Sequence, residues 1–427
     1  MLFRPVPVSI SVQKMLTKGV CPESEGSGFV NGMRRPTYQW FLAMVFLMGT
    51  ISGLAQVSAD PPQAAQQPIL VDDNFLQIKG AQAQFESANQ VSDDTKAAIR
   101  QGRALSVPYF NNSFSHQGEA YPFTTVGKNP KRGEITSVGT QLIPISMFFE
   151  GFADQDGKPI TLDVAPVLAR FQNSPNFRRF TYGTGLTQFA DAVQRAQFFH
   201  VMDPDWHTLL DRPRILTPLT IDVPRGSASL FRVRSTGAIF AVVDTGFFVS
   251  QLNSIIQLEN LDAESLPIAL TNNVLLAPSA NVQRCCVVGF HTAFEMGERR
   301  NAPLVQTFVW GSWIDAGILG TDFADVTAVS HEISEWMNDP FGTNLVPVWQ
   351  FPNGTAGCQN NLETGDPLET SVHASFPVTI DGFVYHPQNQ AMLQWFTRET
   401  PSSAIDGAYS YPNESLLTAP SQPCAAK

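Results

Sequence analysis

The sequence has few charged residues, few cysteines and no cluster of basic side chains. Charged residues make up 15% of the 427 residues, and 38 acidic residues outnumber 27 basic ones, for a formal net charge of −11. A nucleic-acid-binding surface needs clustered Lys and Arg, so we expect no nucleic-acid partner. The hydrophobic content of 43% is enough for a packed core and argues against a largely disordered chain.

Long apolar runs are also absent, and the longest candidate lies near the N-terminus at residues 40–47. Arg34 and Arg35 precede it, and small residues that suit a cleavage site follow it at residues 53–59. This pattern predicts a signal peptide at 33–59 and a secreted or periplasmic protein with no membrane association after cleavage. An uncleaved anchor is the alternative, but the run is short and is followed by Gly49 and Gly53. Residues 1–32 resemble neither a signal nor a domain, and we expect them to be an upstream extension with Met33 as the true start.

Only five cysteines are present, and none has the Cys-x-x-Cys spacing of a zinc ribbon. Apart from Cys21, an even number remains, as expected in an oxidising compartment: Cys285, Cys286, Cys358 and Cys424. Adjacent cysteines do not bond easily in a relaxed strand, which favours long-range bridges from this pair to Cys358 and Cys424. The alternative is that Cys285 and Cys286 are buried thiols.

Glycine and proline are frequent, and apolar runs with strand character dominate the middle of the chain. We predict an α+β fold with a linker at 60–72, a β-rich N-terminal region at 73–280 and a metal-binding region at 281–427. The predicted strands are 142–149, 215–223, 229–233, 238–243, 268–276, 285–290, 307–314 and 376–385. Pro144 predicts that the first of these strands lies at a sheet edge or contains a bulge. Helices are expected at 92–100, where Ser92 can cap, and at 185–199, where apolar residues repeat at helical spacing.

The chemistry concentrates in one helix that Asp325 or Thr327 can cap and that Pro340 ends. His331 and Glu335 lie four residues apart, on one helix face. The pattern His-Glu-x-x-His is the zinc-peptidase signature, and here a glutamate replaces the second histidine. Carboxylates also bind Zn²⁺, so we predict His331 and Glu335 as ligands and Glu332 as the general base for a metal-activated water.

Further ligands are expected downstream of this helix. Apolar neighbours indicate that its acidic residues are buried, and buried carboxylates need a cationic partner. Glu363 or Asp366 could loop back as the third ligand. His291 could be a ligand, a transition-state hydrogen-bond donor or a core histidine. Calcium is an alternative to zinc, because Glu335, Glu363, Asp366 and Asp339 would form an oxygen-rich set.

Four short motifs occur in the same order as in the plant phosphate-induced, exordium-like proteins, and the similarity covers roughly residues 285–400. They are Gly289-Phe290-His291, the His331 to Glu335 motif followed by Asn338-Asp339-Pro340, Leu362 to Asp366, and Leu393-Gln394-Trp395. The chain also resembles a bacterial group of secreted hypothetical proteins. The resemblance implies a secreted zincin-like domain but no substrate. One departure is that Cys358 precedes the acidic segment, whereas the family's cysteine follows it.

We therefore expect a secreted zincin-like metalloprotein, and specifically a zinc-dependent metallopeptidase with a peptide or protein substrate. The strand at 307–314 would lie along the cleft and pair with an extended substrate. The alternative is a non-catalytic secreted or cell-surface binding protein on a metal-stabilised zincin scaffold, because two carboxylate ligands weaken the activation of water by Zn²⁺. In a third interpretation, the acidic helix is structural and binds nothing. The sequence does not specify an oligomeric state.

Overall fold

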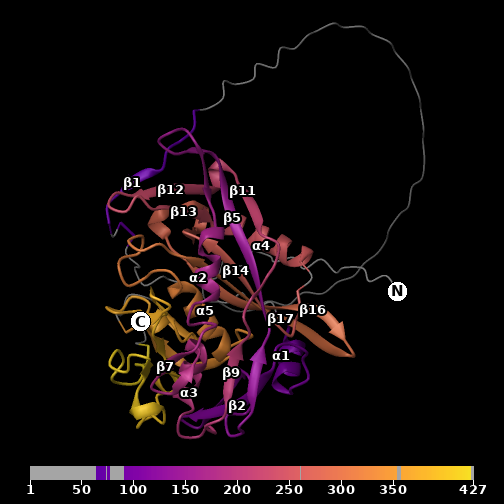
Figure 1. The fold of residues 1–427 in the computed structure, drawn as a ribbon. Helices are drawn as coiled ribbons and strands as arrows, with labels where there is room; N and C mark the ends of the chain where they lie inside the picture. Colours follow the sequence, from indigo (N-terminus) through magenta and orange to yellow (C-terminus); the bar gives the residue numbers. More distant parts are fainter. Residues whose placement is uncertain (1–63, 74, 77–90, 260, 353–356, 425–427) are drawn as a thin grey trace, which may run out of the picture. The chain divides into compact units, whose positions relative to one another are not determined.

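A seven-stranded mixed sheet forms the centre of the fold, and its strands come from both sides of residue 280 (Figure 1). The computed structural model describes residues 64–73, 75–76, 91–259, 261–352 and 357–424. The predicted upstream extension and signal peptide therefore lie outside the described residues. From residue 65 onward, the described residues belong to one structural unit. The fold mixes helices and strands, as the predicted α+β class requires.

The strand order along the sheet is β10-β5-β14-β17-β16, and β6 and β11 also pair with β5. The strands are β5 (Thr140–Ala153), β6 (Pro159–Leu162), β10 (Arg214–Ile215), β11 (Leu219–Val223), β14 (Leu266–Asn272), β16 (Gly289–Arg299) and β17 (Ala302–Trp313). β17 runs parallel to β14, and β16 runs antiparallel to β17. Both sides of β17 are thus paired, so the expectation that this strand receives a substrate is wrong. The strand at that end of the sheet is β16.

β5 lies in the interior of the sheet, although Pro144 predicted an edge or a bulge. On one side Pro144 pairs with Leu270 of β14. On the other side β10 pairs only up to Leu142, and β11 begins to pair at Ile145. Proline lacks a backbone N–H, and it falls at the break between these two partners, where no ladder hydrogen bond is lost.

Both faces of the central sheet are covered, which explains the near-continuous apolar runs of its strands. On one face, Leu142, Leu270 and Val309 pack with Val329 and Ile333 of helix α5 (Thr327–Asn338). On the other face, alternate residues such as Ile143 and Trp310 pack against helix α4 (Thr245–Leu258) and a second sheet. The second sheet has the order β1-β12-β13-β15, with β1 (Ile69–Val71), β12 (Ala228–Val233), β13 (Ile239–Asp244) and β15 (Val274–Ala277). Residues 69–71 were expected in the linker, but they form a strand.

Paired short strands complete the β structure. They are β2 (Tyr109–His116) with β3 (Glu119–Val126), β4 (Ile135–Val138) with β9 (His207–Leu210), β7 (Phe180–Tyr182) with β8 (Gly185–Thr187), β18 (Leu345–Gln350) with β19 (Cys358–Asn361), β20 (Val378–Ile380) with β21 (Phe383–Tyr385), and β22 (Gln390–Ala391) with β23 (Ser410–Tyr411). The strand predicted at 376–385 is therefore a hairpin.

The remaining α-helices are α1 (Asp93–Arg100), α2 (Leu168–Gln172), α3 (Phe189–Gln197) and α6 (Leu393–Thr397). α1 has its predicted cap, since the Ser92 side chain accepts a hydrogen bond from the Thr95 N–H. α3 begins four residues later than predicted, because residues 185–187 form β8. Leu186, which fitted the apolar helical repeat, is 60% exposed there. Among the described residues, no helix has the length and apolar character needed to cross a membrane.

The four cysteines other than Cys21 form two disulfide bonds. Cys358 bonds Cys424, a long-range pairing that was not predicted, because both residues were expected to bridge to the Cys285-Cys286 pair. Cys285 bonds Cys286, so the expectation that adjacent cysteines would bridge to distant partners is wrong for this pair. That expectation assumed a relaxed trans strand, whereas the peptide bond between the two residues is cis.

Candidate metal centre

Helix α5 places His331, Glu332 and Glu335 in the interior of the protein. Every residue of this helix is buried. The helix starts at Thr327, within the predicted region, but neither Asp325 nor Thr327 caps it, because the N-cap residue is Val326 and no side chain makes a cap hydrogen bond. The backbone N–H of Val326 donates to the Asp325 carboxylate at 2.6 Å. At the other end, Asp339 accepts hydrogen bonds from the backbone N–H groups of Thr343 and Asn344, both at 2.9 Å. The helix is thus fixed at both ends, and its acidic turn has a defined position against the sheet.

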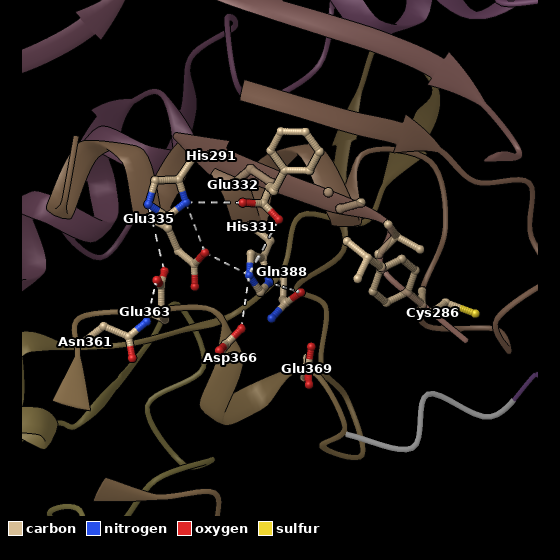
Figure 2. A pocket seen from close by; sticks show the side chains of 16 residues that line it. Cys286, His291, His331, Glu332, Glu335, Asn361, Glu363, Asp366, Glu369 and Gln388 are labelled. Atoms are coloured by element: carbon tan, nitrogen blue, oxygen red, sulfur yellow. Dashed lines mark hydrogen bonds and ion pairs between the residues drawn. The ribbon is translucent and has the colours of Figure 1, made fainter. Parts of the chain in front are cut away.

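Two histidines from different elements face this acidic turn (Figure 2). His331 Nε2 lies 3.0 Å from Glu335 Oε2 and 3.9 Å from Glu332 Oε1. His291, which strand β16 contributes, has its Nδ1 atom 3.3 Å from Glu332 Oε2 and 3.5 Å from Glu335 Oε2. One carboxylate oxygen of Glu335 therefore lies between the two imidazole rings.

The downstream acidic segment returns to the same place, as the sequence predicted. Glu363 Oε2 lies 3.9 Å from His291 Nε2, and Asp366 Oδ1 lies 3.6 Å from His331 Nε2. Asp366 begins a short 3₁₀ helix, Asp366–Leu368. The Gly365 backbone N–H donates to Glu335 Oε1 at 2.9 Å, which ties this segment to α5.

Neutral residues orient these side chains, and the sequence did not predict this role for them. The Gln388 side-chain oxygen lies 3.0 Å from His331 Nδ1, and its amide nitrogen donates to the Gly365 carbonyl at 2.7 Å. With Nδ1 held in this way, Nε2 of His331 points toward the carboxylates. Asn361 donates to Glu363 Oε1 at 2.7 Å. A lone glutamine or asparagine has no sequence signal, because its role comes entirely from where the fold places it.

Two glycines allow the segments to approach the ligands closely. A Cβ atom at Gly289 would lie 2.7 Å from the Glu332 side chain. A Cβ at Gly365 would lie 2.7 Å from Cγ of the His331 ring. Real Cβ contacts are longer than this, so larger residues at either position would displace a site side chain.

The site is buried and strongly acidic. The six residues whose side chains converge are each less than 10% exposed: His291, His331, Glu332, Glu335, Glu363 and Asp366. They line one pocket, and among the described residues that line it there is no Lys or Arg. Buried carboxylates need a compensating positive charge, and among the described residues that line this pocket only the two histidines can provide one.

The buried acidic and histidine side chains strongly shift one another's pKa values. Burial, followed by the charge of Glu335, raises the pKa of Glu363 well above its usual value and raises the pKa of Asp366 to about 8. Burial also raises the pKa of Glu332. Burial acts on Glu335 in the same direction, but the two histidines together outweigh it and lower the pKa of this carboxyl. Burial opposes protonation of His291 and His331, yet the carboxylates raise the pKa of both. The protein's own groups therefore do not keep all four carboxylates charged, and a bound cation would displace protons.

Two groups in this pocket could hold a metal ion: His291, Glu335 and Glu363, and His331, Glu335 and Asp366. The ligand atoms within each group all lie within 4.8 Å of one another. Both candidates for the third ligand, Glu363 and Asp366, are thus brought to the site, together with His291. Asp339 belongs to neither group, since backbone N–H groups after α5 hold its carboxylate. Burial raises the pKa of Asp339 to about 6.

Comparisons with known proteins give no relative for this chain: no family model, no curated protein and no solved structure matches it.

Proposed function

We propose that the chain is a secreted metallopeptidase with a zincin-like core, in which His331, Glu335 and Asp366 bind a zinc ion. The observation that carries the proposal is the position of Glu332. Its carboxylate lines the pocket beside His331 and is the one acidic side chain of α5 that belongs to neither candidate ligand group. It is thus available as a general base.

The ligand set favours zinc over calcium. Calcium binds oxygen ligands almost exclusively, whereas each candidate group contains one imidazole nitrogen. Zinc accepts one histidine with two carboxylates at about 2.0–2.2 Å. A zinc ion held by these residues would act as a Lewis acid that lowers the pKa of a bound water molecule. Glu332 would take the proton from the attacking water, and Gln388 would keep His331 Nε2 directed at the ion.

The sheet supports a peptide as the substrate. β16 ends the strand order of the central sheet, and residues 287–291, which lead into and begin this strand, line the pocket. An extended peptide that lies along β16 would bring its backbone next to Glu332. Recognition of extended peptides at a sheet edge is a common binding mode.

The proposal can be tested with a mixed peptide library and the purified protein, with and without a zinc chelator. We expect cleavage by the wild type, loss of cleavage with the chelator, and recovery when Zn²⁺ is restored. Glu332→Gln should retain zinc but lose cleavage by about 10²-fold or more, as for removal of a general base. If the zinc-loaded wild type cleaves no member of the library, the peptidase proposal is wrong.

The second candidate is a non-catalytic secreted or cell-surface binding protein on a metal-stabilised scaffold. It is favoured by the contact between Glu332 and His291 at 3.3 Å, because a base that is held by a neighbouring histidine is less available to water. In that case the wild type and Glu332→Gln would both bind zinc, and neither would cleave peptides.

A further inference from the structure

The proposed peptidase site uses only one of the two ligand groups. His291 and Glu363 remain, and each comes from a different element than the zinc ligands of α5. His291 lies in β16, two residues after the strand begins at Gly289, and Glu363 follows β19. Both residues are buried, at 3% and 6% exposure. An ordinary packing role does not explain why a histidine and a glutamate are buried together here.

In each of these two side chains, the atom that faces the other side chain lacks a hydrogen-bond partner among the described residues. His291 Nε2 and Glu363 Oε2 are buried and have no hydrogen-bond partner among the described residues. They lie 3.9 Å apart, which is longer than a hydrogen bond. Two ligands at about 2.1 Å from a common zinc ion with tetrahedral angles would be separated by roughly 3.4 Å. A small movement of either side chain would therefore bring both atoms into coordination distance of one ion.

Glu335 connects this pair to the first group. The Glu335 Oε2 atom is 3.0 Å from His331 Nε2. Glu335 also belongs to the second group, in which one ligand atom each of His291, Glu335 and Glu363 all lie within 4.8 Å of one another. A carboxylate in this position can bridge two ions. In known two-metal sites the ions lie about 3.5–4 Å apart, a spacing that one bridging ligand can span.

The charge of the pocket favours a second ion. Five buried carboxylates line it, and neither Lys nor Arg is among the described lining residues: Glu332, Glu335, Glu363, Asp366 and Glu369. When ionised, these carboxylates carry five negative charges. One divalent cation, together with a protonated His291, would leave two of these charges without compensation, which is costly in a low-dielectric interior. Two divalent cations held by neutral histidines would leave only one.

We propose that the pocket binds two divalent transition-metal ions. Glu335 bridges them, His331 and Asp366 complete the site of one ion, and His291 and Glu363 complete the site of the other. Glu332, which contacts both histidines, lies beside the pair. This inference concerns metal binding alone and does not require that a peptide is cleaved.

The experiment is a titration of the full chain, first freed of metal, with Zn²⁺, followed by dialysis and measurement of the zinc content per chain. We expect two zinc ions in the wild type and one in Glu363→Gln. Asp366→Asn should also retain one, and Glu335→Gln should bind both more weakly. Glu369 lines the same pocket but is in neither group, so Glu369→Gln is the matched control and should retain two. Circular dichroism of each variant establishes that it is folded.

A second measurement tests whether the ions are adjacent. Two Mn²⁺ ions bridged by Glu335 should give an exchange-coupled electron paramagnetic resonance spectrum in the wild type and an uncoupled spectrum in Glu363→Gln. One zinc ion per wild-type chain would overturn the two-metal inference and leave the peptidase proposal intact. Two uncoupled ions, or two ions that persist in Glu363→Gln, would also overturn it. Two coupled ions without peptide cleavage would support the inference and reject the proposed activity.

Discussion

At the scale of single residues, neutral neighbours position the charged side chains of the candidate metal centre. Gln388 holds Nδ1 of His331, Asn361 holds Glu363, and two glycines leave room for the side chains of Glu332 and His331. The candidate ligands His331, Glu335, Glu363 and Asp366 were predicted from helical spacing and from a cluster of acidic residues. The neutral residues beside them could not be predicted, because amide side chains and glycines are common throughout the chain.

Gly289→Ala tests the close approach of β16 to Glu332, the proposed general base. The new methyl group would overlap the Glu332 side chain and force it to move, so the proposed peptidase activity should fall by about 10²-fold or more. The free energy of unfolding should fall by about 1–3 kcal/mol from overpacking. Gly226→Ala is the control, because a Cβ there meets no atom within 4 Å and should change neither quantity. Full activity in Gly289→Ala would contradict the role given to Glu332.

Gln388→Ala tests the orientation of His331. Loss of the hydrogen bond to Nδ1 should weaken zinc binding by about 10–100-fold, as is typical when a partner of a ligating histidine is removed. Zinc affinity by competition with a chromophoric chelator provides the measurement. Gln172→Ala removes a glutamine that donates to the Pro213 carbonyl away from the pocket, and should retain wild-type affinity. An equal loss in both variants would show that the effect is not specific to the site.

At the scale of elements, the most chemically specific helix was also the best predicted. The start of α5 near Thr327 and its end before Pro340 were expected from local signals, although Val326 is the N-cap residue in place of the predicted Asp325 or Thr327. α3 was predicted to start too early, because Leu186 fitted a helical repeat by coincidence. Residues 307–314 were wrongly predicted as the strand that pairs with a substrate, for a different reason. The order of strands in a sheet depends on long-range pairing, and the sequence of 307–314 does not indicate that this strand has partners on both sides.

The segment before α5 contains a pH-dependent contact. His386 Nδ1 lies 2.6 Å from the Asp325 carboxylate, and this hydrogen bond raises the pKa of His386, as does the charge of Asp322. A histidine with a raised pKa in the folded state stabilises the fold fully below its unfolded pKa of about 6.5. This stabilisation is lost as the pH rises through the folded pKa.

We therefore expect His386→Asn to reduce the free energy of unfolding at pH 5.5 by more than at pH 9. Urea denaturation of both proteins at the two pH values provides the measurement. His200→Asn, at an exposed position just after α3, is the control and should show little change at either pH. The same loss of stability for His386→Asn at both pH values would mean that the contact does not depend on protonation.

At the scale of the whole molecule, the site exists because segments far apart in sequence meet at one end of the central sheet. Strand β16, helix α5 and the segment after β19 each bring part of it. The α+β class, and the presence in 281–427 of His and acidic residues that could hold a metal ion, could be predicted from composition and motifs. It could not be predicted that one sheet contains β5, β14, β16 and β17. Apolar runs show that strands are buried, but they do not show which strands pair.

The Cys358–Cys424 bridge links β19, which leads to Glu363 and Asp366, to the C-terminal segment. It closes a loop with a sequence separation of 66 residues. Replacing both cysteines by serine should lower the free energy of unfolding by about 4 kcal/mol, the cost of releasing a loop of this length in the unfolded chain. Chemical denaturation without reductant, compared with the wild type, provides the measurement. A loss under about 1 kcal/mol would show that other contacts already hold these segments together.

Whether this pocket is a metal centre can be measured as the metal content of the protein purified without chelator, by mass spectrometry of the wild type, Glu335→Gln and Glu369→Gln. Glu335 belongs to both ligand groups, whereas Glu369 lines the same pocket and belongs to neither. We predict stoichiometric transition metal in the wild type and in Glu369→Gln, and loss of most of it in Glu335→Gln. A folded wild-type protein without stoichiometric metal, or metal that remains in Glu335→Gln, would contradict the assignment of this pocket as a metal centre.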